Sequence, residues 1–276
     1  MLDALSPPRR RLVLALLALA AAAALALAGL VAVRGLGGDR PAAGPPVDVQ
    51  PDEPGPVLLV PGYGGSTGGL GPLRTALEAA GRQVRVLPLP GDGQGDLREQ
   101  ARALRDAADE LLRATGAGSV DVVGYSAGGV VARLWAQELG GSQQARRIVT
   151  LGSPHHGTSL AALAETLAPG ECPTACRQLV PGNDLLDELN ADETPSGPAY
   201  IAVWTTRDQT VVPPTSGRLD GATNIELQSV CADATTAHGD LPRDPLVVGL
   251  VLRQLSAEPV LEPGPADCAP LRAAGS

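Results

Sequence analysis

From Val57 onward, short apolar runs alternate with segments of helical spacing. The run 57–60 has the pattern of a buried strand, and the segment 70–81 has apolar residues at helical intervals and ends on a glycine. The same alternation predicts strands at 83–89, 119–124, 146–152, 199–206 and 223–230, and helices at 96–115, 127–140 and 245–255. Alternation of this kind produces a mostly parallel sheet with helices on both faces. Because ligands bind beyond the carboxyl ends of such strands, we expect functional residues directly after strands.

Ser126 lies in the pentapeptide Gly-Tyr-Ser-Ala-Gly, between the predicted strand 119–124 and the predicted helix 127–140. This is the context of a nucleophile elbow, in which a sharp turn exposes the serine Oγ at the head of a helix. The turn needs small neighbours, which the two glycines supply, and the helix dipole favours negative charge beside the serine. The alternative is a glycine-rich helix start with serine as its cap, so the choice depends on residues elsewhere.

A general base is needed because a serine hydroxyl is a weak nucleophile until its proton is removed. The chain has three histidines, and His238 is the last of them. It follows the last predicted strand and precedes the last predicted helix. Chains with this elbow carry the order serine, acid, histidine, so we predict His238 as the base, with a surface-loop histidine as the alternative.

The acid of such a site holds the second imidazole nitrogen and is expected between the serine and the histidine. Asp208 lies directly after the predicted strand 199–206 and before His238. The other aspartates of this interval lie within the irregular region 156–198 or just before a strand. We therefore predict Asp208 as the acid, with a plain turn residue as the alternative.

A glycine-rich loop follows the first predicted strand, at residues 61–66. Acyl transfer needs hydrogen-bond donors at the developing oxyanion, and glycines leave backbone N–H groups exposed. We predict the N–H groups of Tyr63 and Ala127 as these donors. The alternative for the loop is an ordinary strand-to-helix connection.

Three further side chains fall next to predicted strand ends, namely Tyr125, His155 and His156. Both histidines precede Asp208, so neither fits the expected place of the base. We expect these side chains either to line the pocket or to serve the structure around it, where aromatic rings pack well.

The first 40 residues are predicted to be a targeting segment. Three arginines at 9–11 precede an uncharged apolar run at 12–33, which at ~1.5 Å per residue could cross about 30 Å of hydrocarbon. An Ala-Leu-Ala sequence at 26–28 also resembles a signal-peptidase site, so a cleaved signal peptide and a membrane anchor both remain open. In either case the arginines stay inside and the body lies outside.

The rest of the chain is predicted to divide into a proline-rich linker at 41–56, the main domain at 57–256 and a C-terminal tail at 257–276.

The charge of the chain argues against one class of partner. Its formal net charge is −9, although its first 40 residues are basic, so the exported body is strongly acidic. Nucleic-acid binding needs clustered positive charge, and we expect no nucleic-acid partner. We expect the body to be a monomer.

Four cysteines follow the targeting segment. An even number in an exported chain predicts two disulfides. Of the three pairings we favour Cys172–Cys176, which closes a local loop, and Cys231–Cys268, which ties the tail to the body. The short spacing of the first pair also occurs in metal sites, but no second pair or close histidine accompanies it. We expect neither a metal ion nor a cofactor.

Five segments resemble, in the same order, those of secreted bacterial lipases and esterases of the α/β-hydrolase superfamily, the group called lipase class 2. They lie between residues 57 and 256 and read LLVPGYGGS, VVGYSAGG, TLGSPHHGT, RDQTVVPP and AHGDLPRDP. The resemblance implies the α/β-hydrolase fold with a small cap insertion near 156–198. It also implies the roles already predicted: nucleophile Ser126, acid Asp208, base His238, and oxyanion donors Tyr63 and Ala127.

Two features depart from that family. Pro61 stands where the family commonly has a histidine. Position 61 is not one of the three predicted catalytic positions, so this departure does not affect them. The region 156–198 is also short for a large mobile lid, so the choice between lipase and esterase stays open.

Three functions remain after these observations. The leading one is an exported serine hydrolase of carboxylic esters, acting on triacylglycerol-type or shorter acyl esters. An acyltransferase that builds cell-envelope lipids outside the membrane would use the same three side chains. A non-catalytic binding protein of the same fold is the third, and the complete set of triad residue types argues against it.

Overall fold

The computed structural model describes residues 49–276. The predicted targeting segment, including the run 12–33, and the first half of the linker, residues 41–48, lie outside the described residues. None of the helices in the described range combines the length and the apolar character needed to span a bilayer.

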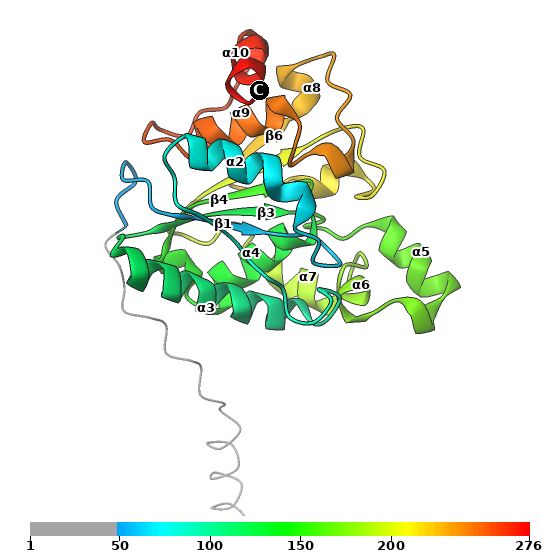
Figure 1. The fold of residues 1–276 in the computed structure, drawn as a ribbon. Coiled ribbons are helices and arrows are strands. Elements are labelled where there is room, and N and C mark those ends of the chain that lie inside the picture. The colour runs from blue at the N-terminus through cyan, green and yellow to red at the C-terminus, as the bar shows by residue number, and fades with distance from the viewer. Residues whose placement is uncertain (1–48) are drawn as a thin grey trace, which may run out of the picture. The chain divides into compact units, whose positions relative to one another are not determined.

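Among residues 49–276, six parallel strands form one sheet in the order β2-β1-β3-β4-β5-β6 (Figure 1). The strands are β1 (Val57–Val60), β2 (Val84–Val86), β3 (Val120–Tyr125), β4 (Ala145–Leu151), β5 (Ala199–Trp204) and β6 (Thr223–Glu226). The chain runs outward from β1 to β2 and then returns past β1 to β3. The strand order therefore reverses between β1 and β3, and open sheets of this kind bind ligands at the carboxyl ends of such a pair.

Helices cover both faces of the sheet (Figure 1). One layer contains α3 (Leu97–Thr115) and α4 (Ala127–Glu138), and the other contains α2 (Gly71–Ala79) and α9 (Pro245–Gln254). Alternate residues of each strand enter opposite cores, because successive strand side chains point to opposite faces. Leu58 thus packs in the cluster with α3 and α4, whereas Leu59 packs in the cluster with α2 and α9.

Two expectations about secondary structure are wrong. The predicted strand 223–230 ends at Glu226, and α8 (Leu227–Val230) follows, with the Cys231 N–H donating to the Leu227 carbonyl at 2.8 Å. The C-terminal segment, predicted as a tail, contains α10 (Cys268–Ala274). This helix packs closely on α9, where a Cβ at Gly249 would overlap the Leu271 carbonyl oxygen.

The region 156–198 forms the small cap of short helices that the sequence predicts. It contains α5 (Ser159–Leu167), α6 (Thr174–Gln178) and α7 (Asp184–Leu189). Arg133 of α4 is buried and donates to the Leu189 carbonyl at 3.0 Å, the Asn190 Oδ1 at 2.9 Å and the Glu193 carbonyl at 3.0 Å. These three bonds attach the end of α7 to α4.

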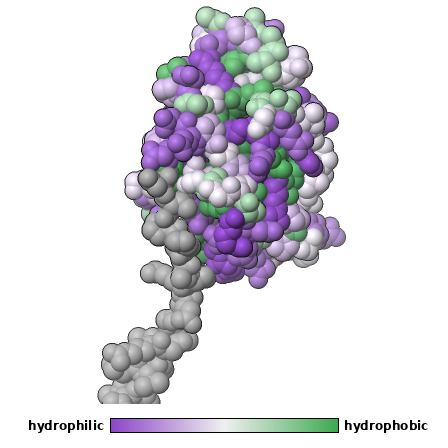
Figure 2. Space-filling view, turned by 60° about the vertical axis from the view of Figure 1, so that its left-hand side comes forward, coloured by the Kyte–Doolittle hydropathy of each residue, from purple (hydrophilic) through white to green (hydrophobic). Residues whose placement is uncertain are grey.

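Most charged residues lie at the surface, where Figure 2 shows hydrophilic residues interspersed with smaller hydrophobic areas on one face. An ion-pair cluster at the amino ends of the strands is buried instead. Asp121 Oδ2 lies 2.6 Å from both Arg82 Nη2 and Arg146 Nη2, and the Asp121 side chain is fully buried. Arg146 also donates to the Leu255 carbonyl at 2.8 Å, so the cluster ties the end of α9 to the sheet.

Replacing Asp121 with asparagine is expected to lower the free energy of unfolding by about 3–5 kcal/mol, because two largely buried guanidinium groups lose their counter-charge. Urea denaturation of the folded protein measures this difference. Asp106→Asn is the control, since Asp106 is 68% exposed beside Arg105 and exposed pairs contribute about 0–1 kcal/mol. Equal midpoints for the two variants would contradict the expectation.

Candidate active site

Ser126 occupies a strained turn between β3 and α4. Its φ is 53°, and among residues 49–276 no other residue besides glycine has a positive φ. Such backbone costs free energy and persists only where the surrounding structure holds it. The Ser126 N–H donates to the Leu151 carbonyl at 2.9 Å, which links the turn to the end of β4.

The glycines around Ser126 are required by close packing. A Cβ on Gly124 would lie 2.5 Å from the Gly129 Cα, and one on Gly128 would overlap the carbonyl oxygens of Val60 and Pro61. The start of α4 therefore lies directly against β3 and the end of β1. A side chain at either position would push the serine away from the sheet edge.

The three predicted catalytic side chains lie in hydrogen-bonding contact. His238 Nε2 lies 3.0 Å from Ser126 Oγ, and His238 Nδ1 lies 2.7 Å from Asp208 Oδ2. The other carboxylate oxygen, Oδ1, accepts the N–H groups of Thr210 and Val211, each at 2.8 Å. Those bonds orient the Asp208 carboxylate, and all three catalytic candidates are buried.

The two residues predicted to supply the oxyanion donors are a neighbour of Ser126 in the chain and a residue of the same cavity. Ala127 is the first residue of α4, and the N–H of a first helical residue has no acceptor within its own helix. Tyr63 lines the same cavity as Ser126, and within residues 49–276 its N–H donates to no acceptor. The Tyr63 hydroxyl donates to Gln94 Oε1 at 2.8 Å, which holds the loop after β1 in place.

A cavity of about 260 Å³ opens next to Ser126. Its wall is largely apolar and includes Pro154, Leu160, Ala161, Ala164, Leu179 and Val211. Three of these residues belong to α5, whose Leu163 and Leu167 are exposed. A larger cavity of about 770 Å³ lies at the amino ends of β4 and β5, remote from every predicted site residue. The smaller cavity is therefore the one that can hold a substrate for Ser126.

Tyr125, His155 and His156 do not line this cavity, so that part of the expectation is wrong and the structural alternative applies. The Tyr125 hydroxyl donates to the His238 carbonyl at 3.2 Å, and burial raises the pKa of Tyr125 to about 12. His155 is fully buried with Nε2 3.1 Å from Thr150 Oγ1, and burial lowers the pKa of its imidazole well below the usual value. His156 Nε2 instead lies 2.8 Å from Glu193 Oε1.

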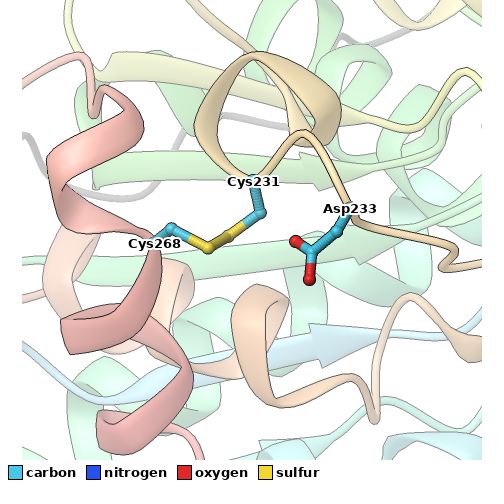
Figure 3. A group of neighbouring side chains, drawn as sticks. All are labelled: Cys231, Asp233 and Cys268. Carbon is cyan, nitrogen blue, oxygen red and sulfur yellow. A yellow bond between two sulfur atoms is a disulfide. The ribbon is translucent and has the colours of Figure 1, made fainter.

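Both disulfides have the pairing favoured from the sequence, Cys172–Cys176 and Cys231–Cys268. Figure 3 shows the second of them with the Asp233 carboxylate beside it. Metal ions bind thiolates, and disulfide sulfurs are not thiolates. Asp233 is also engaged, since its Oδ1 lies 2.9 Å from Arg272 Nη2. Cys231, Asp233 and Cys268 lie close enough together to resemble a metal site, but their disulfide and ion pair attach α10 to the rest of the domain instead.

Gly152 is a site residue that the sequence reasoning missed. It follows β4 with a φ of 55°, and a Cβ there would lie 3.2 Å from Asp208 Oδ2 and 3.3 Å from His238 Nδ1. A side chain would thus crowd the contact between acid and base. The signal was present, because a glycine directly after a predicted strand fits the same strand-end rule that selected Asp208.

Comparison with known proteins identifies the fold of the chain. Residues 55–169 match the family model described as the alpha/beta hydrolase fold. The chain has the α/β-hydrolase fold. The fold class predicted from the sequence is therefore confirmed, and no curated protein matches this sequence.

Solved structures with the α/β-hydrolase fold include lipases from a bacterium and a fungus. The mature Bacillus licheniformis lipase BlEst2 superimposes with a TM-score of 0.63 at 20% identity, covering 77% of this chain and 96% of that one. Its propeptide form gives 0.63 at 20% identity, covering 78% of this chain and 53% of that one. The Aspergillus fumigatus lipase B gives 0.63 at 18% identity, with 83% and 64% covered. At these identities the similarity concerns the fold.

Proposed function

We propose that the protein is an exported serine hydrolase of carboxylic esters. The observation that carries the proposal is the continuous contact from Ser126 Oγ to His238 Nε2, at 3.0 Å, and from His238 Nδ1 to Asp208 Oδ2, at 2.7 Å. A serine, a base and an orienting acid in this order of contact form the arrangement that activates a hydroxyl.

In the first half of the reaction, Ser126 Oγ attacks the carbonyl carbon of the ester while His238 Nε2 accepts the hydroxyl proton. The carbonyl oxygen becomes an oxyanion, to which the N–H groups of Tyr63 and Ala127 donate. Asp208 stabilises the imidazolium through Nδ1. The tetrahedral intermediate then collapses, His238 returns the proton to the leaving alcohol, and an acyl-Ser126 ester remains.

In the second half, His238 Nε2 accepts a proton from a water molecule, which attacks the acyl carbonyl. The same two N–H groups bind the second oxyanion. When this intermediate collapses, the proton returns to Ser126 Oγ and the carboxylic acid leaves. The residues named supply every proton transfer that the cycle requires.

The substrate is proposed to be an ester with an apolar acyl chain, including lipid esters. The cavity beside Ser126 is mostly apolar, which suits an alkyl chain. Leu160 lines the cavity and is partly exposed, and Leu163 and Leu167 of the same helix are also exposed. An apolar surface thus adjoins the cavity, as a lipid substrate would need.

Export is proposed from two observations. The sequence predicts a targeting segment in its first 40 residues, and the body holds two disulfides, which persist in oxidising compartments outside the cytoplasm. The finding expected is that a protease added to intact cells digests the body, or that the body is recovered in the medium. Recovery only inside intact cells would contradict export.

The enzymatic proposal is tested with the full-length protein, a fluorophosphonate and a series of nitrophenyl esters of two to sixteen carbons. We expect covalent labelling at Ser126 and release of the free carboxylic acid. Absence of both labelling and hydrolysis would favour a binding protein. Appearance of the acyl group mainly on an added lipid alcohol would favour the acyltransferase.

Acyl-chain preference is expected to change when the cavity is shortened. Ala164→Leu adds bulk to the cavity wall, so kcat/KM for long acyl esters should fall about 10-fold or more while that for acetate esters stays near wild type. The nitrophenyl ester series measures this. Ala162→Leu is the matched control, because Ala162 lies on the same helix outside the cavity wall. A uniform change across all chain lengths would contradict the assignment of this wall.

A further inference from the structure

A buried polar junction lies between the segment that carries Asp208 and the segment that carries His238. Thr205 follows β5 directly and is fully buried. Its Oγ1 donates to the Thr236 carbonyl at 2.9 Å and accepts the Arg207 N–H at 3.1 Å. One hydroxyl therefore bonds to both segments, a single residue away from Asp208 on one side and two residues away from His238 on the other.

Gln228 of α8 completes the junction. Its Nε2 donates to Thr205 Oγ1 at 3.0 Å and to the Ala234 carbonyl at 3.1 Å. Its Oε1 accepts the Thr206 N–H at 2.9 Å. Gln228 thus bonds to the same two segments as Thr205 and to Thr205 itself, which closes a continuous hydrogen-bonded unit.

The two segments are otherwise separate parts of the chain. Residues 205–211 form the turn after β5, in which the Asp208 N–H donates to the Thr205 carbonyl at 3.2 Å. Residues 231–238 run from α8 toward α9, and Thr236 Oγ1 donates to Asp244 Oδ2 at 2.6 Å. The junction therefore ties the turn of the acid to a loop whose other end is attached to α9.

We propose that Thr205 and Gln228 are positioning residues that set the distance and angle between the Asp208 carboxylate and the His238 imidazole. Neither side chain lines the cavity beside Ser126, so the pair acts through the acid and base. The inference rests on the proposed serine-hydrolase function. In this proposal, the hydrogen bonds of Thr205 and Gln228 maintain the 2.7 Å contact between His238 Nδ1 and Asp208 Oδ2.

The deciding variant is Thr205→Val, which keeps the shape of the side chain and removes the hydroxyl. Displacing a catalytic group by about 1 Å can lower the rate by about 100-fold, so we expect kcat to fall by up to about that factor with KM little changed. Thr205→Ser restores the hydroxyl and should return most of kcat. Thr115→Val is the matched control, because the Thr115 hydroxyl also donates to a carbonyl, at 2.8 Å, and accepts the N–H two residues later, at 3.2 Å.

A double-mutant cycle separates positioning from a general structural effect. If Thr205 acts through the acid, Thr205→Val should cost much less in an Asp208→Asn background than in wild type. An equal loss in both backgrounds, or a wild-type kcat for folded Thr205→Val, would overturn the proposal. If Thr205→Val does not fold, Gln228→Glu removes the donor to Thr205 and Ala234 and is judged by the same two criteria.

Activity measurements on the wild type and on Thr205→Val together distinguish a failure of this proposal from a failure of the proposed function. Wild-type protein that neither hydrolyses esters nor reacts with a fluorophosphonate would remove the proposed function and, with it, this proposal. An active wild type with an unaffected Thr205→Val variant would remove the positioning pair alone.

Discussion

Replacing Ser126 with alanine is expected to lower kcat for ester hydrolysis on the order of 10⁶-fold, and to abolish fluorophosphonate labelling. The reason is that the acyl-enzyme ester forms on Ser126 Oγ, which lies 3.0 Å from His238 Nε2, and alanine has no atom to take its place. The cavity and the predicted oxyanion donors remain, so weak substrate binding should persist. Initial rates with a nitrophenyl ester and mass spectrometry of the labelled protein measure both effects.

Ser256→Ala is the control for this experiment. The Ser256 hydroxyl donates to the Arg253 carbonyl at 2.8 Å and lies outside the cavity that contains Ser126, so this variant should hydrolyse and label as wild type does. The assignment of Ser126 would be abandoned if Ser126→Ala retained labelling at an unchanged rate. Loss of activity in both variants would point to a general effect on folding.

Asp208→Asn is expected to lower kcat by about 10⁴-fold while leaving the fold intact. Asparagine keeps the Oδ1 that accepts the N–H groups of Thr210 and Val211, so the turn should hold. Its amide would donate to His238 Nδ1, which places the imidazole proton on Nε2. The Nε2 atom then cannot accept the proton of Ser126 Oγ. Initial rates and fluorophosphonate labelling rates should fall together.

Asp187→Asn is the matched control, because Asp187 lies on α7, between Ser126 and His238 in the chain, as Asp208 does. Wild-type activity is expected for it. A loss of less than about 10-fold in kcat for Asp208→Asn would remove Asp208 from the proposed mechanism. A loss of about 10⁴-fold for Asp187→Asn would instead assign the acid to the cap.

Local patterns in the sequence were sufficient to select three residues that the structure brings together. Ser126, Asp208 and His238 each follow a predicted strand, and parallel strands end at the same edge of a sheet. Residues that follow different parallel strands are therefore expected to lie close together, even when they are far apart in the sequence. Separations of 112 and 30 residues along the chain thereby become contacts of 3.0 and 2.7 Å.

Two segments adopt structures that their local sequence patterns do not predict, because long-range packing determines them. The segment 223–230 has the sequence pattern of a strand. Its second half nevertheless forms α8, from which Gln228 donates to Thr205. The C-terminal segment has little helical pattern, yet α10 forms there against Gly249, next to the Cys231–Cys268 disulfide. In both cases contacts from distant residues stabilise the helix, and single-sequence patterns do not contain those contacts.

The sequence by itself determined the alternation of strands and helices, the turn that exposes Ser126, and the order of serine, acid and base. These are local properties, because apolar periodicity and small residues at a tight turn act over a few neighbouring positions. Only the tertiary structure decided that Tyr125, His155 and His156 lie outside the cavity, that α5 forms its wall, and that a buried threonine and glutamine join the acid and base segments. Those outcomes depend on the packing of segments far apart in the chain, which short-range spacing does not encode.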